Sequence, residues 1–458
     1  MDFLAETNDG IAFADLQRSV ALQDWPWVVR SAQAILREEG LVLAETQQDW
    51  VIEALILALE WGDFQVRWEV ANVLPMLGER AIEPLLEWLQ EDDLDADVQW
   101  FGIRMLGRWA GEAGLNRLLE VLRFGTPDLQ SMALSVLIQQ GNAILDRISP
   151  LLTLDETRLL AVKILSGIRS RDTLNLLLTV VTDENSEIRT VALEALSSFQ
   201  DERLGLVFIE ALSDSVTSVR QAATTALGFC QTLSAVDRTV HLVPLLWDIR
   251  ISVCCAAASS LGRINHEESI AALQKALFSQ PLPTPLGLEL ARSLFHIGNT
   301  ASYEDAIVGL SAYVMKSAMQ ETNILACNPF NSDVRSEIFR ILGRVENPIA
   351  KSIALHAVLK CLEQQNLNVI DRTLAITALG QLKDPRSIDP LIQQLIHPAP
   401  SLRLHILHAL QHIDPSIAFD RLQSQFSQSQ FSQSQFSQSP LTDALQNGIH
   451  FALTEWRS

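Results

Sequence analysis

The segment SVRQAATTALG, residues 218–228, contains no catalytic motif, yet its pattern predicts a helix. Counted from Val219, its apolar residues fall at positions 0, 3, 4, 7 and 8, which places them on one face of an α-helix. Gly228 follows this face directly, and we expect it to end the helix in the left-handed conformation that glycine adopts at little cost. The segment therefore predicts a short, complete helix with one buried face.

The same register recurs in eleven copies, at intervals of 28 to 48 residues. The residue after position zero in the successive copies is Arg67, Gln99, Gln130, Arg158, Arg189, Arg220, Cys254, Gly287, Arg335, Arg372 and Arg403. A second apolar stretch lies between copies, for example AIEPLLEWLQ at 81–90 and SIDPLIQQLI at 387–396. Because a pair of such short helices cannot bury its own apolar face, neighbouring pairs must stack. The sequence thus predicts an all-α fold, an α-solenoid of about eleven helical-hairpin repeats.

The composition fits one continuous array, because 48% of the 458 residues are hydrophobic and no segment alternates as a strand would. We expect N-terminal capping helices over residues 1–65 and the repeat array over 66–420, with an insertion at 299–333. A tract at 421–440 repeats Phe-Ser-Gln-Ser-Gln and has too few apolar groups to offset the entropy of ordering, which predicts a disordered low-complexity linker. The amphipathic stretch at 441–458 predicts a C-terminal helix.

Membrane segments are not expected from the sequence. The most apolar run, VIEALILALEW at 51–61, contains Glu53 and Glu60 and is too short to cross a bilayer. The start of the chain, MDFLAETNDG, is acidic and has no basic region ahead of an apolar stretch, so we expect no signal peptide and a cytoplasmic location.

Cysteine and histidine offer weak signs of chemistry. No two of the five cysteines have the Cys-x-x-Cys spacing, and Cys254 and Cys255 fall within a helix, so we expect reduced thiols that pack in the core. His405, His408 and His412 are spaced three and four apart, which is compatible with a metal-binding helix face. Without matching carboxylates, a solvated helix face is the favoured interpretation and no metal site is expected.

The repeats resemble HEAT repeats, and most closely the HEAT-like repeats of the phycobilisome (bilin) lyase type. The resemblance rests on LGRINHEESIAALQKAL at 261–277 and LGQLKDPRSIDPLIQQLI at 379–396, each a helix end, a polar turn and a second helix. It also rests on an Asp six residues before the register Arg, as in Asp183 with Arg189 and Asp214 with Arg220. The resemblance implies a right-handed solenoid in which these residues form a structural ladder and the Arg-bearing helices line the concave face. This ladder is incomplete: Asp93 precedes Gln99, Asp248 precedes Cys254, and Asn366 in place of Asp precedes Arg372.

The formal net charge of −21 argues against nucleic acid as a partner. Binding to phosphates needs a basic surface, whereas residues 1–130 contain 24 acidic residues, 9 Arg and no Lys. The acidic surface favours a basic protein partner.

Motifs of known enzymes are also missing: the chain has no Gly-rich phosphate loop, no Gly-x-Ser-x-Gly and no His-Glu-x-x-His. We therefore expect a non-catalytic scaffold, adaptor or chaperone-like protein without a cofactor. The alternative follows from the resemblance: a bilin lyase or bilin-handling protein that acts on a phycobiliprotein, with a linear tetrapyrrole as its substrate.

Tryptophan marks the candidate binding surface, because eight of the ten Trp lie within the first 109 residues. Register positions 2 and 6 point away from the buried face, and two adjacent copies place Trp or Arg there. We predict that the partner-binding residues are Trp68, Asn72, Trp100 and Arg104, rimmed by Asp93 and Asp97. Exposed Trp beside Arg is the pairing enriched at interaction hot spots, although Trp packed against a neighbouring helix is the competing interpretation.

Overall fold

The computed structural model describes residues 5–37, 44–89, 94–108, 112–297, 300–320, 331–364, 367–397, 399–433 and 440–456. Every regular element in these ranges is a helix, and no β-strand occurs among them. The predicted all-α fold class is thereby confirmed. The chain divides into two compact units, Met1–Phe199 and Gln200–Ser458, which are described separately.

Unit 1 is a series of helix pairs. Its helices are α1 (Ala5–Ala21), α2 (Trp25–Arg37), α3 (Glu45–Trp61), α4 (Phe64–Val73), α5 (Ile82–Trp88), α6 (Ala96–Leu106), α7 (Glu112–Phe124), α8 (Pro127–Gln139), α9 (Leu145–Ile148), α10 (Asp155–Gly167), α11 (Arg171–Leu178) and α12 (Ser186–Leu196). Short 3₁₀ helices precede or follow some of them, namely η1 (Leu74–Ala81), η2 (Gly141–Ile144) and η3 (Ser149–Thr153).

Unit 2 continues the same pattern. Its helices are α13 (Leu204–Ala211), α14 (Thr217–Phe229), α15 (Ala235–Leu242), α16 (Ile251–Ile264), α17 (Glu267–Leu277), α18 (Thr284–Phe295), α19 (Thr300–Gln320), α20 (Ser332–Leu342), α21 (Pro348–Leu362), α22 (Val369–Leu382), α23 (Ile388–Gln394), α24 (Pro400–Ile413), α25 (Pro415–Gln433) and α26 (Pro440–Glu455). Two 3₁₀ helices accompany them, η4 (Val243–Trp247) and η5 (Pro385–Ser387).

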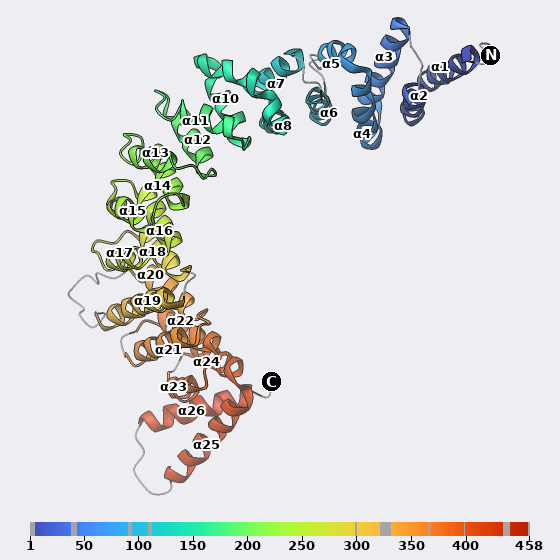
Figure 1. The fold of residues 1–458 in the computed structure, drawn as a ribbon. Coiled ribbons are helices and arrows are strands. Elements are labelled where there is room, and N and C mark those ends of the chain that lie inside the picture. The colour runs from blue at the N-terminus through green and yellow to red at the C-terminus, as the bar shows by residue number, and fades with distance from the viewer. Residues whose placement is uncertain are drawn as a thin grey trace. The chain divides into compact units, whose positions relative to one another are not determined.

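The helices form two layers in each unit, as an α-solenoid requires. The odd-numbered helices, called A helices here, make one layer, and the even-numbered B helices make the other. Consecutive B helices pack side by side, from α2 to α12 in unit 1 and from α14 to α26 in unit 2. Figure 1 shows the two rows in unit 2, with α13, α15, α17 and α19 facing α14, α16, α18 and α20. All eleven copies of the register lie on B helices.

The core lies between the layers and is made by the predicted stripe. In α14, Val219, Ala223, Ala226 and Leu227 have no solvent exposure. Small side chains such as Ala allow neighbouring B helices to approach closely, and α14 packs extensively on α16. Burial of this stripe against the next pair supplies the stability that an isolated 13-residue helix lacks.

The role expected of Gly228 is wrong. Gly228 lies inside α14 with ordinary helical backbone, and the helix continues to Phe229. A Cβ atom on Gly228 would lie 2.6 Å from the Cβ and Oγ of Ser260 on α16. Glycine is therefore required at this position by close helix packing, whereas the left-handed helix ends in unit 2 belong to Asn265 and Lys383.

In most copies the register residue, which is the residue after position zero, donates hydrogen bonds to backbone carbonyls between the two helices of a pair. Arg189 donates to the carbonyl oxygens of Asp183 and Glu184 at 2.7 and 3.1 Å, and Arg220 donates to that of Asp214 at 2.9 Å. Two of the residues that stand in place of Arg do the same: Gln99 donates to the carbonyl of Leu94, and the thiol of Cys254 donates to that of Asp248. The common function of these residues is to satisfy backbone carbonyls that would otherwise lack a donor.

The Asp side chains connect one pair to the next. The carboxylate of Asp183 accepts from Arg158 of the preceding pair at 3.1 Å and also caps the amide of Asn185. In unit 2, Arg220 binds the carboxylate of Asp248 through two hydrogen bonds of 2.9 Å. Arg189 and Arg220 thus contact the backbone carbonyl of the Asp six residues earlier, whereas the carboxylates of Asp183 and Asp248 accept from an Arg of the preceding repeat.

The Ser/Gln/Phe tract differs from the expected linker. Helix α25 extends through it to Gln433, and residues 434–439 lie outside the described part of the chain. The reason is a neighbouring surface: Leu422 is fully buried, and the ring of Phe426 stacks on that of His450 from α26. Helix α26 packs in turn on α24 and α25.

The insertion begins with the longest helix of the chain's described residues, α19, which packs against α17 and α21 in the A layer. Residues 321–330 of the insertion lie outside the described residues.

Candidate functional site

The predicted binding residues that the structure describes lie on two neighbouring B helices of unit 1. Trp68 and Asn72 project from α4, Trp100 and Arg104 project from α6, and the two helices pack together. The guanidinium carbon of Arg104 lies 4.3 Å from the centre of the Trp68 ring and 5.5 Å from that of Trp100. Arg104 therefore connects both indoles, through cation–π contacts that are each worth about 0.5–2 kcal/mol.

Two phenylalanines extend this arrangement. Phe64 stacks on Trp68 with ring centres 6.5 Å apart, and it meets the edge of Phe101 at 5.5 Å. Phe101 is buried and touches Trp100, whereas the exposed fractions of Phe64 and Trp68 are 67% and 37%. The group Phe64, Trp68, Trp100 and Arg104, named the Trp–Arg cluster here, is thus anchored in the core at one end and open to solvent at the other.

Asn72 and Arg108 fix the end of α4 beside the cluster. The Asn72 side chain donates to the carbonyl of Trp68 at 3.0 Å. Arg108 donates through one nitrogen to the Asn72 side-chain oxygen at 3.2 Å and to the carbonyl of Ala71 at 3.4 Å. These contacts hold Arg108 near the surface that the cluster forms.

A hollow of about 460 Å³ adjoins the cluster near the C-terminal ends of α4, α6 and α8. Its lining consists of Asn72, Arg104, Gly107, Arg108, Met132, Ser135, Val136, Gln139 and Gln140. Arg104 and Asn72 belong to both the predicted site and the hollow, so the two form one continuous surface.

The predicted acidic rim is only partly described. Asp97 is exposed in the first turn of α6, three residues before Trp100. Asp93 lies outside the described residues. Of the other tryptophans, Trp88 is buried in α5 and Trp61 is 65% exposed at the end of α3, whereas Trp109 is not among the described residues.

Sequence reasoning missed Phe64 and Arg108. Phe64 lies four residues before Trp68, and Arg108 lies four residues after Arg104. Residues four apart share one face of a helix, so each lies one turn away from a predicted site residue. Extending the register by one turn in both directions would have found them.

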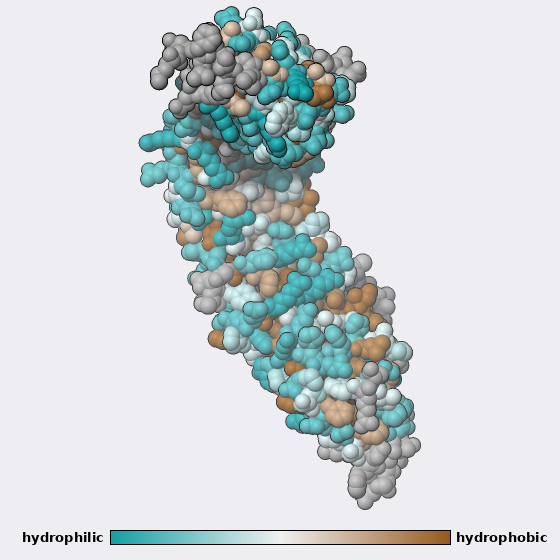
Figure 2. Space-filling model, turned by 90° about the vertical axis from the view of Figure 1, so that its right-hand side faces the viewer, coloured by the Kyte–Doolittle hydropathy of each residue, from teal (hydrophilic) through white to brown (hydrophobic). Residues whose placement is uncertain are grey.

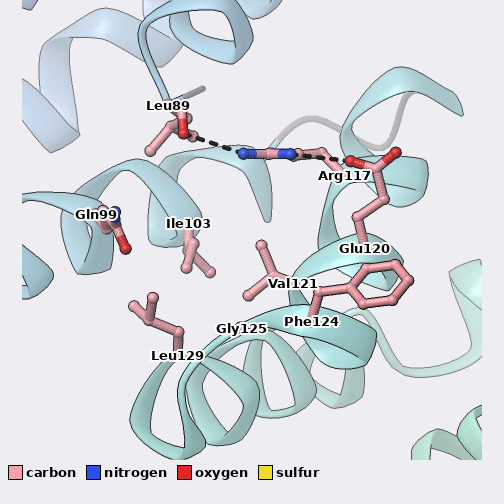
Figure 3. Close-up of a pocket in the computed structure, with 9 residues that line it drawn as sticks. All are labelled: Leu89, Gln99, Ile103, Arg117, Glu120, Val121, Phe124, Gly125 and Leu129. Carbon is pink, nitrogen blue, oxygen red and sulfur yellow. Dashed lines mark hydrogen bonds and ion pairs between the residues drawn. The ribbon is translucent and has the colours of Figure 1, made fainter. Parts of the chain in front are cut away.

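A smaller hollow of about 220 Å³ lies between α6, α7 and α8. Figure 3 shows the side chains of Ile103, Val121 and Leu129 converging on it. Arg117 at its edge donates to the carbonyl of Leu89 at 3.0 Å and to the carboxylate of Glu120 at 2.9 Å. Because its charged side chains bind each other, this hollow has less capacity to recognise a ligand than the surface beside the Trp–Arg cluster.

Unit 2 contains an apolar hollow of about 590 Å³ between α19 and α21. Arg386 at its rim is bound by the carboxylate of Asp384 at 2.7 Å. Seen from the side of its B helices, unit 2 presents a largely hydrophilic surface with separate apolar patches (Figure 2).

The described cysteines are free thiols, and three of them have raised pKa values. Burial raises the pKa of Cys255 to about 11 and that of Cys361 to about 12. Burial likewise raises the pKa of Cys254, whose thiol donates to a backbone carbonyl. These three groups stay protonated at neutral pH, which suits packing and disfavours nucleophilic chemistry.

The histidine face of α24 is solvated. His405, His408 and His412 are all exposed, and the rings of His408 and His412 lie 5.3 Å apart. Across the described ranges, no group of three or more His, Cys, Asp or Glu side chains is arranged to hold a metal ion. None of the helices in these ranges combines the length and hydrophobicity that a membrane crossing requires.

Comparison with family models identifies the repeats. Residues 148–228 match the model for HEAT repeats, and residues 253–279 and 371–397 match that for the PBS lyase HEAT-like repeat. The chain contains HEAT repeats. Its match to the lyase type of repeat confirms the resemblance inferred from the sequence, and a comparison with curated protein sequences finds no match.

Solved structures similar to this chain include importin β, the phycocyanin lyase complex from Nostoc and human deoxyhypusine hydroxylase. Importin β has a TM-score of 0.47 at 14% identity over 96% of this chain, and the chain spans 64% of its length. The phycocyanin lyase complex has a TM-score of 0.29 at 18% identity, covering 61% of this chain and 94% of that one. The hydroxylase has a TM-score of 0.26 at 18% identity, covering 63% and 99%.

Proposed function

We propose that this HEAT-repeat protein is a non-catalytic scaffold, adaptor or chaperone-like protein that binds a protein partner on the B-helix layer of unit 1. The Trp–Arg cluster is the anchor of this binding surface. Trp and Arg are the residue types that contribute most to binding energy when a partner covers them. A solenoid of stacked repeats provides the extended surface on which such an anchor can act.

The observation that carries the proposal is the stacking of Arg104 over a Trp68 ring that remains 37% exposed. Phe64 stacks on the same Trp68 ring, and Trp100 contacts the Arg104 guanidinium. Side chains that are already ordered lose little entropy on binding, so a larger share of the contact energy appears as affinity. The acidic composition of residues 1–130 supports a protein partner over a nucleic acid.

Replacement of Trp68 and Trp100 by Ser tests the proposal. Because both rings are partly exposed, we expect the double variant to keep its helical content and to lose most of its capture of the partner from a cell extract. Quantitative mass spectrometry of the captured proteins measures the loss, and circular dichroism follows unfolding. Trp247→Ser, at a Trp in unit 2 that is 52% exposed, is the matched control and should capture as the wild type does.

Two outcomes contradict the proposal. Unfolding of the double variant at ordinary temperature would place both tryptophans in the core. Unchanged capture by a stable double variant would place the binding surface elsewhere.

Bilin handling is a second candidate function, favoured by the two matches to the PBS lyase HEAT-like repeat. In the matched segments, Arg372 and Cys254 donate hydrogen bonds to the backbone: Arg372 to the carbonyls of Leu362 and Gln364, and Cys254 to the carbonyl of Asp248. Titration with a linear tetrapyrrole, followed by its visible absorbance and by tryptophan fluorescence, tests this candidate. A spectrum unchanged by the protein would remove it.

A further inference from the structure

The hollow beside the Trp–Arg cluster is positively charged within an acidic part of the chain. Residues 1–130 carry a net charge near −15, yet among the described residues the charged side chains that line the hollow are Arg104 and Arg108 alone. The remaining lining residues are uncharged. The local charge is thus opposite to that of its surroundings, which favours an anionic group at this point.

Both arginines retain hydrogen-bonding capacity. Among the residues that the structure describes, none accepts a hydrogen bond from the guanidinium of Arg104, which is only partly exposed. Arg108 uses one nitrogen to hold Asn72 and Ala71, so its other donors remain for a ligand. A guanidinium that stacks on an indole still directs its N–H groups outward in the plane, where they can bind a carboxylate through two parallel hydrogen bonds.

The apolar part of the surface adjoins this charge. Phe64 and Trp68 are exposed on the side of Arg104 that faces α4, and Arg104 itself lines the hollow. A volume of about 460 Å³ lies within the range of pockets that accept small ligands or a few side chains. A short peptide that places an acidic residue next to an aromatic one matches both features at once.

We propose that this hollow binds the carboxylate of an Asp or Glu side chain in the partner, between Arg104 and Arg108, while a neighbouring aromatic side chain of the partner packs on Phe64 and Trp68. This inference rests on the proposed function and specifies the recognition element of the partner. The partner is then a protein with an exposed acidic–aromatic segment, even though the acidic surroundings of the site attract basic residues farther along it.

Fluorescence anisotropy of labelled five-residue peptides tests the inference with the full chain. The probes have a Phe-Glu-Phe core, and in the matched peptides Gln or Lys replaces Glu. We expect the Glu peptide to bind about tenfold more tightly than the Gln peptide, because a charge-assisted bidentate pair is lost. Arg104→Gln should remove this preference, and Arg104→Lys should restore only part of it.

Arg123→Gln is the matched control, because Arg123 also stacks on an exposed aromatic ring, that of Phe124, at 5.2 Å. This variant should keep the wild-type preference for Glu. Equal binding of the Glu and Gln peptides, tighter binding of the Lys peptide, or no binding of the Glu peptide up to about 1 mM would each overturn the inference.

The variant Trp68→Ser separates this inference from the proposed function. If it weakens all peptides while the Glu and Gln peptides bind equally, the cluster is an anchor and the carboxylate assignment falls. If it affects no peptide, the cluster is not the binding surface and both proposals fail.

Discussion

At the scale of single residues, the side chain after position zero has one function in most copies, which is to donate to the carbonyls of the turn before its helix. The sequence could predict the position because the register repeats, and it could predict an Asp–Arg relation from the six-residue offset. It could not decide which Asp each Arg binds, because successive repeats bring two Asp within reach. The structure shows that Arg220 uses the backbone of Asp214 and the carboxylate of Asp248. Gln99 and Cys254 show that a donor, and not a charge, is the requirement of the turn.

Asp248→Asn tests the connection between repeats. The hydrogen bond from Arg220 lowers the pKa of Asp248, so the native state favours the ionised carboxylate. Its stabilisation is therefore present above the ordinary Asp pKa of about 4 and is lost as pH falls through the lower native value. Because the Arg220 side chain is only 11% exposed, we expect the free energy of unfolding of the variant to be lower than that of the wild type by about 1–3 kcal/mol at pH 7. This difference should shrink as the pH falls below 4.

Urea unfolding at several pH values measures this difference. Asp201→Asn is the control, because Asp201 binds Arg203 only two residues away and does not connect repeats through that contact. The control should shift the midpoint much less at every pH. A deficit of Asp248→Asn that stayed constant down to pH 3 would contradict the ionic connection.

At the scale of elements, the apolar periodicity was sufficient to place the eleven B helices that carry the register, α4 to α24, because a buried stripe must repeat with the helical period. It was not sufficient to explain Gly228 or α25, because both depend on a neighbour that is distant in sequence. Gly228 faces Ser260 on α16, and α25 is ordered by contact with α26. Local composition alone predicted a helix end in one case and disorder in the other.

Gly228→Ala tests the packing role of glycine. In an exposed helix interior this change would stabilise by up to about 1 kcal/mol, whereas here the added Cβ meets Ser260 and we expect a loss of about 1–3 kcal/mol. Because Ser260→Gly removes the opposing atoms, the same change in that background should cost clearly less. Thermal or urea unfolding of the four proteins gives the coupling energy. Independent effects of the two substitutions would refute the contact.

At the scale of the whole molecule, repeats determine the fold and leave the function to a few exposed side chains. The register was able to predict Trp68, Asn72, Trp100 and Arg104 as outward-facing, and it marked α4 and α6 as unusual among the copies. It could not show that Arg104 stacks on Trp68 or that Arg108 joins a hollow, because these contacts cross between helices. The proposed function places partner binding on the B helices α4 and α6 of unit 1.

Site-specific photo-crosslinking tests this assignment most directly. A benzophenone amino acid replaces Gln139, an exposed residue that lines the hollow, or Ile249, which is 91% exposed in unit 2. If the proposed function is correct, irradiation in cell extract crosslinks one protein through position 139 and not through position 249, and Trp68→Ser with Trp100→Ser abolishes this crosslink. A partner that crosslinks only through position 249, or through position 139 regardless of the two tryptophans, would contradict it.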